Sequence, residues 1–401
     1  MTRMLESGEA ARRLGVKLPT LYAYVSRGLL SSHPAPGGRR SLFTAEDVEA
    51  LAKRSRGGRT TETRLATVTT STTQLRDDGP VYRGTPATVL ATTVPYEEAA
   101  ELLWRGDPEL PWQGDSERPT GWEPVRLRPP RALGASDRLR WAVLMAGAGD
   151  PLRSDLRPPS VVAVARRLVA TMVSVLPGPA PDPPPLELDG RRWHHTVAGA
   201  LTARLAPEPG PALVRAVNAA LILLADHELA TSTVAVRVAA STRADLYDAL
   251  LAGLGVVAGP LHGGASQLAY TLMSDAERVG PERALDETLR WQHRLPGFGH
   301  TVYRGVDPRF TVLKGLVDDL WSPDRRRILD ALLALAADRH IPGPNVDLGL
   351  GALMRAAGMP EDGGRTIFTI ARVAGWTAHY LEELEERPVR YRARAVYATR
   401  P

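Results

Sequence analysis

The chain has 401 residues, of which 43% are hydrophobic, so it can bury a large core and should fold into two or three globular units. It contains no cysteine, which excludes disulfides and thiolate chemistry and is typical of a reducing compartment, so a cytoplasmic protein is expected. The net charge is +5, and the longest apolar runs are too short to span a bilayer, so no membrane association is expected.

The first sixty residues carry the basic charge of the chain. They hold 11 Lys and Arg against 5 Asp and Glu, whereas the remaining residues hold 39 against 40. Such an excess favours a nucleic-acid partner. Turn residues and apolar spacing predict short helices and a basic hairpin, or wing, in this segment. The predicted helices cover residues 7–14 and 19–28 and begin again after residue 44, and the wing covers residues 37–40.

This arrangement resembles winged helix-turn-helix domains of the MerR and excisionase type, here residues 1–54. In that family the second helix enters the major groove and the wing contacts phosphates, so the resemblance implies DNA binding. An alternative is that the module has lost DNA binding and serves as an interaction surface. Residues 55–60 are glycine-rich and charged, which is typical of a linker. The resemblance implies that DNA is contacted by Thr20, Tyr22, Tyr24, Arg27, Arg39 and Arg40.

Beyond the linker, a short β-rich segment precedes a mostly helical region. Residues 69–82 predict a hairpin that turns at Asp77-Asp78-Gly79-Pro80. Apolar residues then recur at three- and four-residue spacing, which favours packed helices. The proline-rich residues 177–185 predict an exposed connection, because proline is excluded from helix interiors. The predicted helices cover residues 94–104, 136–146, 161–176, 212–224 and 243–254.

Two glycine-flanked histidines and one aspartate form the most informative pattern. His262 lies in Gly-Pro-Leu-His-Gly, His300 ends Pro-Gly-Phe-Gly-His, and Asp347 ends Asn-Val-Asp. Glycines beside a histidine let a substrate lie against both backbone and imidazole. A single histidine of this kind is more often structural, but the three motifs together predict an acid/base site.

These motifs, in this order, resemble those of the citrate synthase family over about residues 61–400. Further matching segments are 225–228, 303–309 and 392–397. The resemblance implies a mainly α fold with large and small helical domains that follow the helix-turn-helix domain. The implied large domain covers residues 61–258 and 348–401, and the implied small domain covers residues 259–347 and closes over the site.

Members of this family join the methyl carbon of acetyl-CoA to oxaloacetate and then hydrolyse the thioester. The resemblance implies that Asp347 is the base, His262 the partner of the enolate and His300 the donor to the ketone. Neither a metal nor a permanently bound cofactor is expected, since acetyl-CoA is a co-substrate. For oxaloacetate the resemblance implies His227, Arg309, Arg372 and, across a homodimer, Arg392. For CoA it implies Arg304 and the loop residues Leu295, Pro296, Gly297, Phe298 and Gly299.

Three functions stay open at this stage. The first is citrate synthesis, and the second is 2-methylcitrate synthesis from propionyl-CoA, which differs by one methylene. The third is a metabolite-sensing DNA-binding regulator built on the same fold. The chain departs from the family after Asn-Val-Asp, where an aromatic or histidine and a serine usually precede a glycine and this chain reads Leu348-Gly349-Leu350-Gly351, and at Ser266 and Ala230, where asparagine is usual. These departures bear on acyl-CoA preference and substrate orientation.

Overall fold

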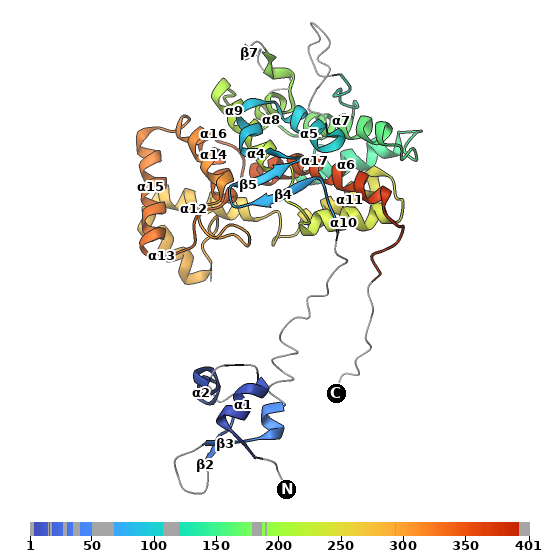
Figure 1. Ribbon diagram of the computed structural model, residues 1–401. Coiled ribbons are helices and arrows are strands. Elements are labelled where there is room, and N and C mark those ends of the chain that lie inside the picture. Colours follow the sequence, from blue (N-terminus) through green and yellow to red (C-terminus); the bar gives the residue numbers. More distant parts are fainter. Residues whose placement is uncertain are drawn as a thin grey trace. The chain divides into compact units, whose positions relative to one another are not determined.

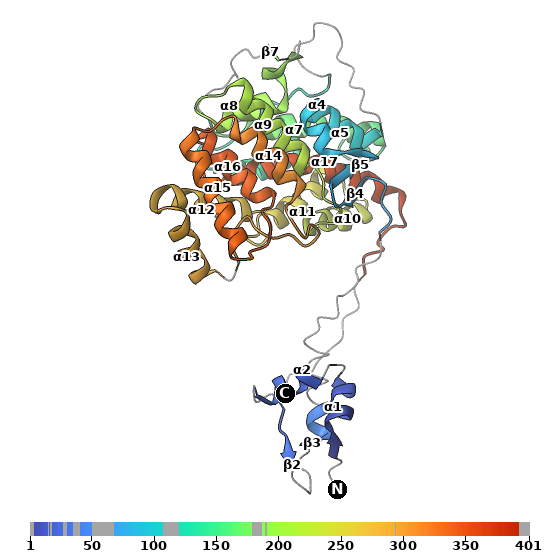
Figure 2. The same ribbon diagram turned by 60° about the vertical axis from the view of Figure 1, so that its left-hand side comes forward.

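The structure is a computed structural model that describes residues 4–14, 16, 18–26, 30–34, 41–49, 68–106, 120–178, 187–188, 191–292 and 294–392. The chain divides into two compact units, one of residues 1–68 with 393–401 and one of residues 69–392 (Figures 1 and 2).

The N-terminal unit contains the predicted pair of helices. Its elements are β1 (Met4–Glu6), α1 (Ser7–Leu14), α2 (Leu18–Ser26), β2 (His33–Pro34) and β3 (Ser41–Thr44), followed by helical residues 45–49. The strands form an antiparallel sheet in the order β1-β3-β2. Leu5, Leu21 and Phe43 are fully buried between the sheet and the helices. The predicted wing at residues 37–40 and the linker at residues 55–60 lie outside the described residues.

The larger unit opens with the predicted β segment. Its strands are β4 (Thr73–Arg76), β5 (Gly79–Tyr82) and β6 (Thr85–Pro86), which pair antiparallel in this order and confirm the hairpin. Gly79 has a φ of +120°, a conformation that side chains other than glycine rarely adopt. Tyr82 is fully buried, and its hydroxyl donates to the Ile222 carbonyl at 2.8 Å. This hydrogen bond attaches the hairpin to the helical body.

Helices make up the rest of this unit, as the sequence predicts. The five predicted helices correspond to α5, α6, α7, α9 and α11, with ends that differ by at most three residues. The proline-rich connection lies outside the described residues from 179 to 185. The helices are α4 (Ala87–Thr93), α5 (Tyr96–Arg105), α6 (Ala135–Ala148), α7 (Pro158–Ser174), α8 (Val197–Leu205), α9 (Pro211–Leu224), α10 (Thr231–Ser241), α11 (Leu246–Val257), α12 (Ala265–Val279), α13 (Pro281–Trp291), α14 (Pro308–Asp318), α15 (Pro323–Asp338), α16 (Val346–Ala357) and α17 (Gly363–Glu385), with a short ribbon of β7 (Glu187–Leu188) and β8 (Arg191–Arg192) and the 3-10 turn η1 (Trp193–His195).

Helix α17 forms the centre of the unit and is buried over most of its 23 residues (Figure 1). It packs against α5, α7, α9, α10 and α11. Small residues along it permit this close approach. A Cβ at Gly375 would collide with the Asp226 carboxylate and lie 2.5 Å from the Ala225 carbonyl oxygen. Glycine therefore lets α17 touch the backbone of the turn that follows α9.

Helices α12 to α16 lie together at one side of the unit in both views (Figures 1 and 2). Helix α16 packs against α12 and α14. A Cβ at Gly351 would lie 2.8 Å from the Tyr270 nitrogen, and one at Gly349 would lie 3.1 Å from the Leu313 Cβ. Gly349, which departs from the family pattern, and Gly351 thus both serve close helix packing. In the described part of the chain, no helix is both long and apolar enough to cross a membrane.

Candidate active site

Two buried arginines connect the predicted acid/base residues. Arg372 of α17 acts electrostatically on His227, His262 and Asp347. Arg309 of α14 acts on His227 and Asp347 and also on His300. Contacts place these side chains together: Arg309 Nη2 lies 3.4 Å from His300 Nε2, and the Phe368 ring meets both the Arg372 guanidinium and the His262 ring. The three histidines and Asp347 come from four separate loops and helix ends, which the fold brings to one place.

Arg309 is held rigidly by a buried ion pair with Asp307. Its Nε and Nη2 donate to the two carboxylate oxygens at 3.1 and 2.8 Å, a bidentate geometry that fixes the guanidinium plane. Asp307 also caps α14 by accepting from the Arg309 backbone N–H at 2.9 Å. The same carboxylate accepts from the Val346 N–H at 3.2 Å. Asp307 therefore ties the arginine to the start of α16.

Arg372 has a guanidinium nitrogen without a partner. Its Nε donates to the Leu224 carbonyl at 2.9 Å, and its guanidinium carbon lies 4.6 Å from the centre of the Phe368 ring. Its Nη1 is buried and has no hydrogen-bond partner among the described residues. Burial lowers the pKa of Arg372, so the charge sits in a water-poor place. A buried cationic donor of this kind suits an anionic ligand.

His227, His300 and Tyr303 form an aromatic cluster beside Arg309. The His300 and Tyr303 rings stack with centroids 4.8 Å apart, and the His227 ring meets the His300 ring edge-on at 5.1 Å. The Tyr303 hydroxyl lies 3.4 Å from the His227 Nε2. Burial, and then the charges of Arg309 and Arg372, lower the pKa of His227. This histidine is therefore neutral at physiological pH.

The backbone fixes the tautomer of His300. The N–H groups of Val302 and Tyr303 both donate to its Nδ1, at 3.0 and 3.3 Å. These two bonds make Nδ1 the acceptor and put the proton of the neutral ring on Nε2, because they outweigh the single longer contact of Nε2 with the donor Arg309 Nη2 at 3.4 Å. Burial and the charge of Arg309 lower the pKa of His300, which keeps the ring neutral. His300 can thus donate one hydrogen bond without adding a full charge.

His262 lies in the turn before α12 and meets two side chains from other helices. Its Nε2 is 2.8 Å from the Ser232 Oγ, and Ser232 in turn accepts from the Trp376 Nε1 at 3.3 Å. The serine oxygen keeps its proton after accepting from Trp376, and when it donates that proton to His262 Nε2, the imidazole proton is on Nδ1. Burial, and then the charge of Arg372, lower the pKa of His262, so it is also a neutral donor.

Asp347 lies in the first turn of α16 and has a raised pKa. Burial raises the pKa of its carboxyl to about 6, and the charges of Arg309 and Arg372 oppose this rise. Asn345 caps the helix by accepting from the Asp347 N–H at 3.0 Å. The Asn345 amide also donates to the Gly299 carbonyl at 2.8 Å. One side chain therefore positions the aspartate relative to the loop that ends in His300.

The predicted CoA loop, residues 295–299, packs against the start of α16. The Gly297 carbonyl accepts from the Asn345 N–H, and the Gly299 N–H donates to the Gly343 carbonyl, both at 2.8 Å. Gly297 has a φ of +79°, and a Cβ there would lie 2.8 Å from the Leu348 Cβ. Glycine is therefore required at this position by both conformation and space.

The structure places the other predicted residues less centrally. Arg304 is exposed, and so is Arg392 at the end of the described region. Among the described residues, no hydrogen bond or ion pair joins Arg392 to Arg309 or Arg372. In the N-terminal unit, Thr20 and Tyr22 are exposed on α2 and Tyr24 is half-buried. Arg27, Arg39 and Arg40 lie outside the described residues.

Sequence reasoning missed several side chains that shape the site. Asp307 and Tyr303 lie inside a segment that matches the family, so that segment held a signal for them. Ser232 and Trp376 had none, because each meets its partner only through the tertiary fold. Among the described residues, no group of three or more His, Asp and Glu side chains is placed to hold a metal ion.

Comparison with known families gives two matches along the chain. Residues 59–394 match the model of the citrate synthase C-terminal domain, and residues 4–56 match that of a helix-turn-helix domain. The chain is 29% identical to a citrate synthase of Mycolicibacterium smegmatis, over 75% of this chain and 84% of the relative. It is 37% identical to a citrate synthase of Saccharolobus solfataricus, over 49% of this chain and 55% of the relative. The matched stretch spans about half the length of several such relatives.

Solved structures give the same picture. The chain resembles citrate synthase of Thermoplasma acidophilum in a ternary complex with carboxymethyl coenzyme A and oxaloacetate, with 25% identity and a TM-score of 0.69. This likeness covers 84% of this chain and 95% of that one. A citrate synthase of Pyrobaculum aerophilum is also 25% identical, with a TM-score of 0.67, and covers 92% of this chain and 95% of that one.

Proposed function

The chain belongs to the citrate synthase family, and we propose that residues 69–392 condense an acyl-CoA with oxaloacetate and hydrolyse the resulting thioester. The observation that carries this proposal is the buried cluster around Arg309 and Arg372. It combines a carboxylate of raised pKa, neutral histidines, and a guanidinium nitrogen that has no hydrogen-bond partner among the described residues. Carbon–carbon bond formation at a dianionic keto acid needs each of these groups.

Asp347 removes a proton from the methyl group of the acyl-CoA in this proposal. A carboxylate with a pKa of about 6 is ionised at neutral pH and is a stronger base than an ordinary aspartate. The methyl proton is only weakly acidic, so the enolate oxygen needs a donor. The Nδ1–H of neutral His262 supplies it, and Ser232 holds the other ring nitrogen at 2.8 Å.

The enolate carbon then bonds to the ketone carbon of oxaloacetate. The ketone oxygen gains negative charge and takes a proton from His300 Nε2, whose other nitrogen is fixed by two backbone N–H groups. Arg372 Nη1 and the rigid guanidinium of Arg309 bind the carboxylates, together with His227. Water then attacks the thioester carbonyl, which releases CoA as a thiol and leaves the tricarboxylic acid.

The acyl-CoA binds, in this proposal, against the loop of residues 295–299 with its phosphates near the exposed Arg304. Arg392 completes the oxaloacetate site of a neighbouring protomer in a homodimer. Acetyl-CoA is the proposed acyl donor, and propionyl-CoA is the alternative that would make the product 2-methylcitrate. One methylene changes binding by only about 1–3 kcal/mol, so the two donors must be compared directly.

The experiment measures CoA release from each acyl-CoA with and without oxaloacetate, using the purified full chain. Oxaloacetate-dependent release with acetyl-CoA, lost in Asp347→Asn and retained in the exposed control Asp338→Asn, supports the proposal. The ratio of kcat/KM for acetyl-CoA to that for propionyl-CoA then identifies the preferred acyl substrate. A folded protein that releases no CoA from either acyl-CoA contradicts the proposed synthase activity.

We also propose that the N-terminal unit binds DNA. It matches a helix-turn-helix model over residues 4–56, its α2 exposes Thr20 and Tyr22, and its sequence carries an excess of positive charge. Phosphate contacts release counterions, so the affinity should fall steeply as salt rises. The combination favours an enzyme with an attached DNA-binding module, or a regulator that senses the metabolites of the larger unit.

A mobility-shift titration of the full chain on duplexes from its genomic neighbourhood tests this second proposal. Binding should weaken with salt and be reduced in a double Arg39→Ala, Arg40→Ala variant, whereas Glu208→Gln in the larger unit serves as a control. A shift that changes with oxaloacetate or acetyl-CoA would favour the metabolite-sensing regulator. Failure to bind any duplex at low salt would instead favour an interaction module.

A further inference from the structure

Two adjacent glutamates near the end of α17 hold both ends of the larger unit. Glu382 accepts from the Thr70 hydroxyl at 2.9 Å, the Ser71 N–H at 2.8 Å and the Thr72 hydroxyl at 2.9 Å. Glu383 accepts from Arg390 Nε at 2.7 Å and from the Tyr391 hydroxyl at 3.0 Å. We call residues 70–72 and 390–391 the end segments. They lie just inside the boundaries of the unit, at residues 69 and 392.

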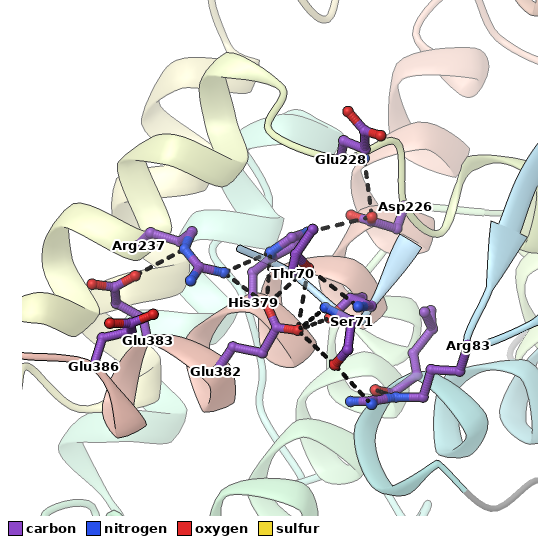
Figure 3. Close-up of polar contacts among 12 residues, drawn as sticks. Thr70, Ser71, Arg83, Asp226, Glu228, Arg237, His379, Glu382, Glu383 and Glu386 are labelled. Atoms are coloured by element: carbon purple, nitrogen blue, oxygen red, sulfur yellow. Dashed lines mark hydrogen bonds and ion pairs between the residues drawn. The ribbon is translucent and has the colours of Figure 1, made fainter. Parts of the chain in front are cut away.

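One buried guanidinium joins the two glutamates. Arg237 of α10 is fully buried, and it donates to Glu383 Oε2 at 2.8 Å and to Glu382 Oε2 at 3.0 Å (Figure 3). The Arg237 Nη1 that reaches Glu382 also lies 2.8 Å from His379 Nδ1. Removing one partner of a buried charge is costly, because the other then stays buried and unpaired. The glutamates, the arginine and the histidine therefore form one connected network.

Arginine determines the tautomer of His379. A guanidinium has only donors, so His379 Nδ1 must accept from Arg237 and the ring proton must be on Nε2. Nε2 faces Asp226 Oδ2 at 3.4 Å, and both side chains are fully buried. Burial opposes ionisation of Asp226, but the hydrogen bond from His379, the charge of Arg372 and a hydrogen bond from Thr73 outweigh it and lower the pKa of Asp226, which is therefore ionised. The network thus ends on a carboxylate directly before His227.

Asp226 holds the turn that carries His227. Its Oδ2 accepts from the Glu228 N–H at 3.1 Å and closes the turn around His227. Glu228 has a φ of +53°, which is a strained conformation for a residue other than glycine. The Glu228 carboxylate accepts from the Leu75 N–H at 3.3 Å, and the Gly375 N–H donates to the Ala225 carbonyl at 3.0 Å. A strained turn persists only when its surroundings hold it, and Asp226 provides the central hydrogen bond.

We propose that His379 is a positioning residue for His227, acting through Asp226, and that Arg237 and the two glutamates link this positioning to both end segments. The inference rests on the proposed binding of oxaloacetate by His227. Through this network, a change in how either end segment is held alters the turn at residues 225–228. The network contains no residue assigned to the chemistry itself.

Two substitutions of His379 separate its two hydrogen bonds. His379→Asn places an amide oxygen near the Nδ1 position, so it keeps the acceptor for Arg237 and loses the donor to Asp226. His379→Gln reaches the Nε2 position and keeps a donor for Asp226. Glu101→Gln is the matched control, because Glu101 is another fully buried carboxylate, paired with Arg166 at 2.5 Å.

The first measurement is amide hydrogen exchange of the peptide containing Glu228 in the full-length variants. His379→Asn should speed this exchange by about tenfold, as expected for loss of a supporting hydrogen bond, and His379→Gln should restore most of the protection. Glu101→Gln should leave it unchanged. Exchange at the parent rate in His379→Asn, or equal acceleration in Glu101→Gln, would overturn the proposal.

The second measurement compares the KM for oxaloacetate with the KM for acetyl-CoA in the parent and the His379→Asn variant. His379→Asn should raise KM for oxaloacetate by about tenfold and change KM for acetyl-CoA by less than about twofold. If the parent protein turns over no oxaloacetate, the proposed function fails, while the exchange measurement still decides the positioning role.

A third variant keeps the proposal testable if His379→Asn does not fold. Glu382→Gln removes charge at the partly exposed end of the network and leaves His379 in place. It should speed exchange both in residues 70–72 and in the peptide containing Glu228. Faster exchange confined to residues 70–72 would contradict the link to the turn.

Discussion

The raised pKa of Asp347 predicts that its replacement stabilises the protein while it abolishes turnover. Burial raises the pKa of this carboxyl from 3.8 to about 6, so the folded chain resists its ionisation more than the unfolded chain does. The resulting loss of folding free energy is absent well below pH 3.8, grows between pH 3.8 and 6, and is constant above that window. At pH 7 it amounts to about 3 kcal/mol. Asp347→Asn, a neutral residue of the same shape, removes it.

Denaturant unfolding followed by tryptophan fluorescence measures this effect. Asp347→Asn should have a free energy of unfolding about 3 kcal/mol above that of the parent at pH 7, and the difference should fall to about 1 kcal/mol at pH 4.5. Asp338→Asn, at an exposed position of α15, should show no such pH-dependent gain. A variant that is less stable than the parent at pH 7, or a difference independent of pH, would refute the assigned environment of Asp347.

Three further predictions follow from the same cluster. The kcat/KM for oxaloacetate-dependent CoA release should rise with pH through about 6 and then level, because Asp347 must be ionised; a profile flat between pH 5 and 7 would exclude it as the base. Arg372→Gln should weaken oxaloacetate binding measured by calorimetry by about 10²-fold or more, because Nη1 is lost, and Arg365→Gln on the same helix is the control; equal losses would argue against a specific contact. Gly297→Ala should lower both turnover and Tm, because its Cβ would meet Leu348 at 2.8 Å, whereas Gly305→Ala meets nothing within 4 Å and should be tolerated.

Local signals were sufficient for much of the fold. Ser7 at a helix start, the Asp-Asp-Gly-Pro turn and the helical spacing of alanine and leucine predicted α1, the hairpin and five of the longer helices. The ends of α7 and α11 differ from the prediction by up to three residues, because proline at the start of α7 and an aspartate cap on α11 decided them. Capping and packing set helix ends more than periodicity does.

The motifs predicted which site residues the chain supplies, but the geometry depends on long-range contacts. Asn345 was recognised only as part of a motif, whereas its side chain joins the aspartate to the histidine loop. The buried Arg237 and His379 gave no sequence signal, because their partners lie about 150 residues away along the chain. Pairings of this kind follow from the packing of α17 at the centre of the unit and from no local pattern.

Carbon–carbon bond formation is the central claim, and it is tested most directly by following the acetyl methyl carbon. Acetyl-CoA labelled with carbon-13 at the methyl position is incubated with oxaloacetate and the full chain, and the products are observed by NMR. The account predicts label in a methylene group of citrate and none without oxaloacetate or in Asp347→Asn. Label recovered only as acetate, at a rate independent of oxaloacetate, would show a thioesterase and contradict the account.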